Sequence, residues 1–201
     1  MTKTTAAVLV FLIALNPLSA AAQTLREIAK RNGGSATGVI SVDEPISRPA
    51  DLMSLADLVV HGRVTSMTTR LDTDERFVIT EYTIAPIQAF KQQQQVSVKT
   101  PGTMSKLVVQ HFGGSLTTAD GLRLSTDVNI FPESETFRAG EEVVLFLQYH
   151  PDTGIYSLIS QFGAYRIRNG VATLMTAKAA KNRGDQPIAS SVLFGELQGK
   201  R

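Results

Sequence analysis

Between residues 58 and 174 the apolar residues recur with a period of two, in short runs separated by turn residues. This alternation is typical of strands that bury one face, whereas an amphipathic helix repeats its apolar residues every three or four positions. The runs Leu58–Val64 and Phe77–Phe90 flank a polar turn at 72–75, which predicts a long hairpin. No pattern of a long helix interrupts this region, so a β-structure is the expected fold.

Glycine, proline and asparagine mark where the strands bend or end. Gly62 lies inside the first strand and predicts a bulge, and Pro86 predicts a bulge or an edge in the second because it has no N–H to donate. Asn169-Gly170 predicts a tight hairpin, since both residues accept positive φ. Further strands are expected at 96–98, 106–112, 122–130, 155–159, 165–167 and 171–174.

The segment Val143–Leu147 is apolar without interruption, which favours a strand that is buried on both faces. We expect Leu145, Phe146 and Leu147 to lie in the core of the barrel. Many short strands with frequent turns favour an all-β fold, namely a closed or nearly closed antiparallel barrel with short helical segments near the N- and C-terminal ends.

The flanks of this region have other patterns. Residues 24–31 predict a two-turn helix, because Thr24 and Glu27 have the spacing of a capping box and Asn32-Gly33-Gly34 follows. One or two helical turns are expected at 51–57 and a short docking helix at 192–198, capped by Ser190 or Ser191. The expected organisation is a signal peptide at 1–22, a helix and linker at 23–49, the barrel at 50–175, and a basic linker with the docking segment at 176–201.

The first 22 residues are typical of a secretory signal peptide. Lys3 precedes the ten-residue apolar run Ala6–Leu15, and Ala20-Ala21-Ala22 supplies the small residues of a cleavage site. The run is too short to span a bilayer, which takes about 20 apolar residues. We therefore expect a secreted or periplasmic protein that begins at Gln23. The chain has no cysteine, which excludes disulfides and thiolate sites.

Several segments resemble a group of secreted bacterial proteins of unknown function with an OB-like barrel. They are the stretches 56–64, 80–84 running to Phe90-Lys91, Gly113-Gly114, and 137–147. More distantly, the order of these segments is similar to netrin-like modules and to the tissue inhibitors of metalloproteinases. The resemblance implies an OB-type barrel. It does not imply metalloproteinase inhibition, because those inhibitors chelate zinc through an N-terminal cysteine that this chain lacks.

The sequence assigns no residue to a catalytic, cofactor-binding or metal site. His61, His111 and His150 are widely spaced and lack the pairing typical of zinc ligands. The acidic turn at 72–75 lacks the glycine and glutamate of an EF-hand loop. Gly113-Gly114-Ser115 lacks the second glycine of a nucleophile elbow. The acidic residues Glu133, Glu135, Glu141 and Glu142 are interpreted as charges that flank an apolar strand, although paired carboxylates can also perform acid–base chemistry.

The net charge of +2 is unevenly distributed, because residues 161–201 carry seven basic and two acidic residues. A solvated tail and a contact with an anionic surface are both compatible with this bias. Aromatic residues do not interleave with these charges, which argues against nucleic-acid binding. Two functions stay open: an exported, non-catalytic module that binds an envelope or extracellular protein, peptide or glycan, and a secreted hydrolase with an acidic and histidine site. Clustering of the histidines would favour the hydrolase.

Overall fold

The computed structural model describes residues 23–40, 48–92, 106–128, 137–160, 163–175 and 186–199, and this part of the chain is mostly β-structure with three short helices. The expected strand at 96–98, the signal segment, Glu133 and Glu135, and most of the basic linker lie outside these residues. The helices are α1 (Leu25–Arg31), α2 (Pro49–Leu55) and α4 (Ser190–Leu197). The strands are β1 (Ser35–Ile40), β2 (Leu58–Leu71), β3 (Val78–Gln92), β4 (Leu107–Phe112), β5 (Gly114–Thr117), β6 (Arg123–Val128), β7 (Glu142–His150), β8 (Ile155–Leu158), β9 (Ala164–Arg168), β10 (Val171–Leu174) and β11 (Ile188–Ala189).

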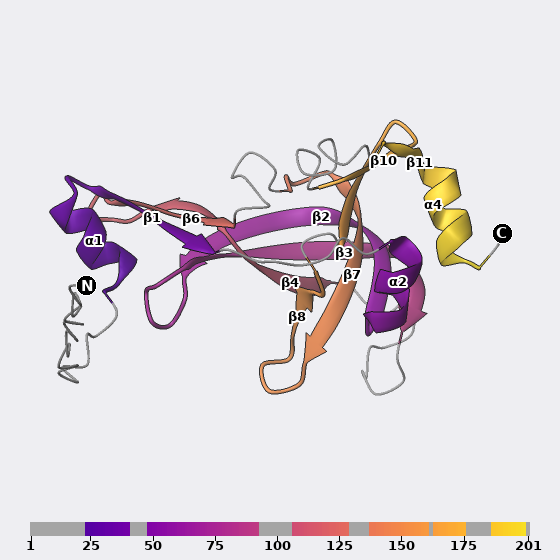
Figure 1. Ribbon diagram of the computed structural model, residues 1–201, viewed down its shortest axis with the longest axis horizontal. Coiled ribbons are helices and arrows are strands. Elements are labelled where there is room, and N and C mark those ends of the chain that lie inside the picture. The colour runs from indigo at the N-terminus through magenta and orange to yellow at the C-terminus, as the bar shows by residue number, and fades with distance from the viewer. Residues whose placement is uncertain are drawn as a thin grey trace, which may run out of the picture.

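The main sheet closes on itself. Its strands follow the order β11-β10-β9-β7-β2-β3-β4-β8, and a further pairing of β8 with β7 joins the two ends of a five-strand ring. All pairings in the ring are antiparallel except β4 with β8, which is parallel. The long β2–β3 hairpin forms the axis of the molecule and joins the lobe around α1 to the ring, with α2 and α4 at the other end (Figure 1). The predicted β-structure, the long hairpin and the short helices near both ends are therefore confirmed.

Strand β7 is buried on both faces, as its sequence predicts. Leu145 and Leu147 point into the ring with Leu58, Val60 and Tyr82. Phe146 is fully buried on the opposite face, where α2 and α4 cover the sheet with Leu52, Leu193 and Leu197. The prediction that Phe146 lies inside the barrel is wrong, because neighbouring residues of a strand face opposite sides of the sheet.

The same alternation accounts for β2. Leu58, Val60 and Val64 face the ring as predicted, and the register of β2 against β3 shifts on both sides of the segment around Gly62. A Cβ atom on Gly62 would lie 2.5 Å from Cγ2 of Ile84 and 2.9 Å from the carbonyl oxygen of Ala85. The bulge therefore brings the two backbones closer than any other residue would allow.

A second, three-stranded sheet covers the far end of the hairpin. Its order is β1-β6-β5, and it buries Ala36, Leu122 and Leu124 against α1 and Val78. Helix α1 has the predicted capping box between Thr24 and Glu27. The linker expected at 32–49 is wrong for residues 35–40, because β1 gains a parallel partner in β6, far along the chain.

The C-terminal helix packs on the outer face of the main sheet through Leu193 and Leu197. The predicted side-chain cap is not used, since the N-cap residue is Ala189 and no side chain caps the helix. Instead the backbone N–H of Ser190 donates to the carbonyl of Gly170, at the tip of the β9–β10 hairpin. That hairpin turns at Asn169 (φ 51°) and Gly170 (φ 74°), as predicted. Among the described residues no helix has both the length and the apolar character needed to cross a membrane.

Candidate functional site

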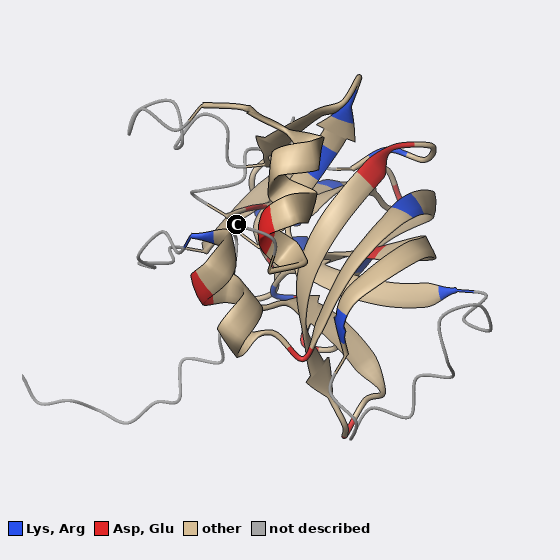
Figure 2. Cartoon of the chain, turned by 90° about the vertical axis from the view of Figure 1, so that its right-hand side faces the viewer, with Lys and Arg blue, Asp and Glu red and all other residues tan. Residues whose placement is uncertain are grey.

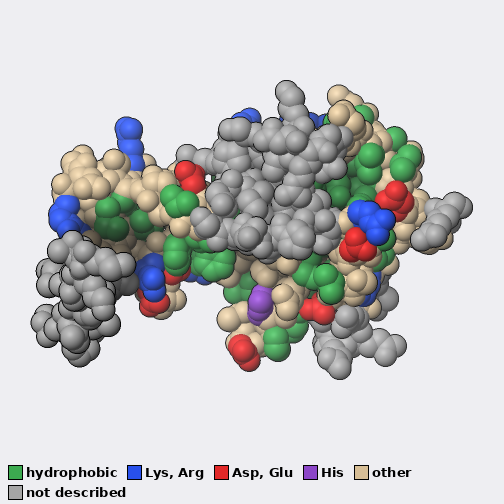
Figure 3. Space-filling model, in the orientation of Figure 1, with side chains coloured by type: hydrophobic (Ala, Val, Ile, Leu, Met, Phe, Trp, Pro, Cys, Tyr) green, Lys and Arg blue, Asp and Glu red, His purple; other side chains and the backbone are tan. Residues whose placement is uncertain are grey.

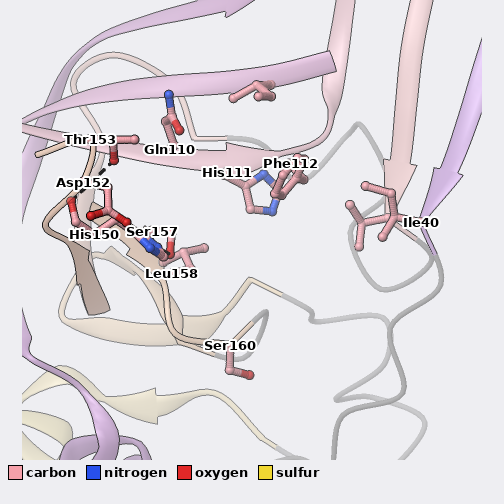
Figure 4. A pocket seen from close by; sticks show the side chains of 12 residues that line it. Ile40, Gln110, His111, Phe112, His150, Asp152, Thr153, Ser157, Leu158 and Ser160 are labelled. Atoms are coloured by element: carbon pink, nitrogen blue, oxygen red, sulfur yellow. Dashed lines mark hydrogen bonds between the residues drawn. The ribbon is translucent and has the colours of Figure 1, made fainter. Parts of the chain in front are cut away.

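A pocket of about 500 Å³ lies where β4, the β7–β8 hairpin and the ends of β1 and β6 meet (Figure 4). This volume is within the range of small-molecule sites in proteins, about 300–1,000 Å³. The chain contributes both apolar and polar side chains to its wall. They are Ile40, Ile79, Gln110, His111, Phe112, Val128, His150, Asp152, Thr153, Ser157, Leu158 and Ser160.

One end of the pocket is apolar. Ile40 and Val128 are register partners at the ends of β1 and β6, and Ile79 and Phe112 are register partners on β3 and β4. Val128 and Ile79 are buried, whereas Phe112 keeps 53% of its surface exposed and stands edge-on to Phe77, with ring centroids 6.1 Å apart. Phe112 therefore offers an aromatic surface at the mouth of the pocket.

The other end is polar and is built by the β7–β8 hairpin. His150 ends β7, and its Nε2 lies 2.7 Å from Oγ of Ser157 on β8. Asp152 and Thr153 follow in the turn, where the backbone N–H groups of Thr153 and Gly154 donate to the carbonyl of His150. In Figure 4 these side chains group on the side of the pocket opposite Ile40, and His111 lies between them and Ile40.

His111 forms part of the wall between these two ends. Burial lowers the pKa of its imidazole from 6.5 to about 4, because the charged form loses its hydration. The ring is therefore neutral at pH 7. Next to it on β4, the side-chain amide of Gln110 donates to Glu81, and that hydrogen bond, together with Arg70, holds the pKa of the Glu81 carboxyl below its ordinary value.

The structure brings two of the three histidines together. His111 and His150 line the same pocket, whereas His61 lies on β2 beneath α4, with its ring 5.0 Å from that of Phe194. His61 Nε2 is 3.4 Å from Glu142, which Arg63 also binds at 2.7 Å. Within the described ranges no group of three or more His, Cys, Asp or Glu residues is arranged to hold a metal ion.

The two acidic residues at the start of β7, Glu141 and Glu142, are each paired with cations. Glu141 binds Arg166 and Arg168, with its Oε2 3.1 Å from Nε of Arg166. Burial raises the pKa of Glu141, but the backbone N–H of Arg138 and the two guanidinium groups outweigh it and hold that pKa below its ordinary value. For Glu142, the hydrogen bond from Arg63 is the main cause of a lowered pKa.

The pairing of Glu141 has two consequences. Glu141 and Glu142 are adjacent and engage different cations, which is unlike a carboxylate pair that shares a proton. Arg166 and Arg168 belong to the basic C-terminal part of the sequence, and in the structure both pair with the single carboxylate of Glu141, which offsets one of their two charges. Seen from the α2 and α4 end, positive and negative residues are interspersed over the described part of the molecule (Figure 2).

The remaining sequence candidates have structural roles. Asp72 accepts backbone N–H bonds from Arg76 and Phe77, and Glu75 pairs with Arg26 of α1, so both stabilise the hairpin turn. Asp74 is exposed at the tip of that turn. Ser115 is an exposed residue of β5 and does not sit at a strand-to-helix turn.

A second, shallower hollow of about 320 Å³ lies on the exposed face of the three-stranded sheet. Its wall is mostly hydroxyl side chains, and Thr37 and Ser125 bond to each other at 2.8 Å. Apolar side chains and a histidine reach the surface elsewhere, on the face shown in Figure 3. The first pocket therefore combines the larger volume with the more varied chemistry.

Pattern reading of the sequence misses the pocket residues Gln110, Phe112, Asp152 and Ser157. Only the polar turn at 151–154 next to His150 gives a local signal, and turns of that composition are common. No family model and no curated protein sequence matches this chain. The resemblance to netrin-like modules stays a prediction.

Proposed function

We propose that this chain is an exported, non-catalytic binding module built on an OB-type barrel. A Greek key places the fourth strand beside the first, in the spatial order 4-1-2-3. The order β7-β2-β3-β4 follows this rule, and β8 completes the ring between β4 and β7. The OB fold is a five-stranded, partly open Greek-key barrel, so this strand order supports the proposal.

The position of the pocket carries the proposal. OB folds bind their ligands on the second and third strands and on the loops after the first and fourth strands. In this chain β3 and β4 are the second and third strands of the ring, and they contribute Ile79, Gln110, His111 and Phe112. The turn between the fourth and fifth strands, β7 and β8, contributes Asp152 and Thr153. The pocket of about 500 Å³ thus involves the strands and the loop that bind ligands in OB folds, which supports the proposal.

The described lining argues against a nucleic-acid ligand. Single-stranded nucleic acids bind along positively charged grooves with aromatic stacking platforms. The lining contains no Lys or Arg, one Asp and one Phe. The partner we propose is an envelope or extracellular molecule, either a peptide, a glycan, or another ligand with an apolar group.

Photo-crosslinking from within the pocket tests this function. A benzoylphenylalanine at position 112 is incorporated into the protein produced in its native envelope, and adducts are identified by mass spectrometry. The matched control carries the same group at Val108, which is on the same strand, 43% exposed and outside the pocket. Adducts formed at 112 and not at 108 support a ligand site, whereas identical adduct patterns refute it.

Export is tested on the same material. The charged start, the ten-residue apolar run and the Ala20–Ala22 segment support cleavage before Gln23. Mass analysis of the protein from the envelope fraction should show the loss of residues 1–22. A cytoplasmic protein that retains Met1 would contradict the proposal.

One observation favours a hydrolase as a second candidate. The 2.7 Å contact between His150 Nε2 and Ser157 Oγ is the spacing of a nucleophile and its general base. A fluorophosphonate probe labels such an activated serine. Labelling that disappears in Ser157→Ala and persists in Ser160→Ala would establish the hydrolase, and absence of labelling at pH 8 would dismiss it.

A further inference from the structure

The two ends of the pocket differ in chemistry, and this difference limits what it accepts. The apolar end is formed by the register pairs Ile40–Val128 and Ile79–Phe112. The polar end carries His150, Asp152 and Ser157 on a single hairpin. A ligand that fills such a pocket needs an apolar part and a polar part on opposite ends, because a polar group buried against the apolar end would lose its hydration without gaining partners.

The charges that line the pocket limit which head group the ligand can carry. Asp152 is the one carboxylate in the described lining, which has no Lys or Arg to pair with an anion. The His111 ring is neutral at pH 7, since burial holds its pKa at about 4. A carboxylate or phosphate head beside Asp152 would meet a like charge, whereas a hydroxyl or an ammonium group would find acceptors in Asp152 and Ser157.

We propose that the pocket binds a single-chain amphiphile whose head group is uncharged or cationic. The aliphatic chain packs against Ile40, Val128 and the Phe112 ring, and the head group lies at the β7–β8 hairpin. This proposal rests on the proposed function, because it names the ligand class of the same pocket.

The size of the pocket suits a small ligand. Its volume of about 500 Å³ lies within the range of small-molecule sites in proteins, about 300–1,000 Å³. An oligosaccharide would need many polar partners along its length, and the apolar end offers none among its four register-paired side chains. A single medium-length chain with a small head group satisfies both ends.

A chain-length series measures the apolar contact. Hexyl-, octyl- and decyltrimethylammonium are titrated into the chain from Gln23 to Arg201 by calorimetry, below the concentrations at which they form micelles. Each added methylene that enters the pocket should tighten binding about four-fold, since burial of one CH₂ is worth ~0.8 kcal/mol. Phe112→Ala should weaken decyltrimethylammonium at least five-fold, and Val108→Ala should leave its affinity unchanged.

A head-group comparison measures the charge preference. Decyltrimethylammonium should bind more tightly than decanoate at pH 7.5, and Asp152→Asn should reduce its affinity about two- to five-fold, the range of an exposed ion pair. Asp74→Asn is the matched control, because Asp74 is an exposed acid on another turn. Decanol supplies the uncharged head.

The possible results distinguish failure of the amphiphile proposal from failure of the proposed binding function. Affinity that does not depend on chain length, or tighter binding of decanoate, would overturn the amphiphile and leave the pocket as a site for another ligand. NMR spectra offer a second test. If the backbone amide signals of β4 and β8 shift on addition of a peptide or an oligosaccharide and not on addition of the amphiphiles, the amphiphile proposal is also overturned. If no probe of any class shifts these signals and position 112 gives no specific adduct, both proposals fail.

Discussion

Phe146→Ala tests the assignment of a second core outside the ring. Phe146 is fully buried: its exposed fraction is 0%, and its ring lies 6.2 Å from that of Tyr165. Truncating a buried Phe to Ala costs about 3–5 kcal/mol. We expect the upper part of this range, about 4–5 kcal/mol, because β7 is held by β2 on one edge and by β9 on the other and cannot shift to fill the space.

The measurement is urea unfolding followed by circular dichroism. The urea curves should show the loss of 4–5 kcal/mol directly, and a thermal unfolding scan should show a matching fall in melting temperature of about 8–20 °C, at 2–4 °C per kcal/mol for a domain of this size. Phe112→Ala is the matched control and should cost no more than about 1.5 kcal/mol, because the Phe112 side chain is half exposed.

A double-mutant cycle locates the lost contacts. Phe146 and Leu193 belong to the same core, between the sheet and α4, so their alanine variants should be non-additive by at least about 0.5 kcal/mol. Leu124 lies in the core beneath α1, and its variant should add to Phe146→Ala within the error. A cost below about 1 kcal/mol for Phe146→Ala, or additivity with Leu193→Ala, would refute the second core.

Three further predictions concern charge and backbone packing. Between pH 6.5 and 4 the unfolded chain protonates His111, whereas the folded chain does not. The free energy of unfolding should therefore have its full value above pH 6.5 and decrease by as much as about 3 kcal/mol as the pH is lowered to 4. His111→Gln should flatten this fall in pH-dependent urea unfolding and the exposed His150→Gln should not; equal slopes in both variants would contradict the prediction. Glu141→Gln should destabilise the fold by about 3 kcal/mol, since it leaves the largely buried Arg166 without its carboxylate, whereas Glu142→Gln, in a more exposed pair, should cost about 1 kcal/mol or less; the prediction fails if the two costs in chemical denaturation are the same. Gly62→Ala should cost about 1–3 kcal/mol in thermal unfolding because its Cβ would meet the Ala85 carbonyl, and a melting temperature equal to that of the parent would show that β3 yields easily at this point.

Local sequence patterns predicted the structural elements that neighbouring residues determine. The capping box of α1, the Asn169-Gly170 turn and the bulge at Gly62 each depend on residues within a few positions of one another. The burial of β7 on both faces could also be predicted, because it requires only an uninterrupted apolar run.

Features made by distant partners could not be predicted in this way. Strand β1 is rich in small residues and becomes a strand because β6 supplies its ladder. The pocket forms because β8 pairs with both β4 and β7, which brings His150 near His111. Neither pairing produces a recognisable pattern in the sequence of one chain. The same is true of the contact of Glu141 with Arg166 and Arg168.

The forked pairing of β7 also sets an order of events during folding. One edge of β7 pairs with β2, while the other edge pairs first with β9 and then with β8. Strands β2, β3 and β4 pair in chain order. The outer edge of β2 pairs with β7 and the outer edge of β4 pairs with β8, so both edges stay unpaired until the residues beyond 141 are present. Contacts between distant residues form slowly, and strand edges that are still unpaired favour association between chains. We therefore expect β7 and β8 to close the ring late in folding. A truncated chain that ends before β7 should aggregate instead of forming a smaller stable domain.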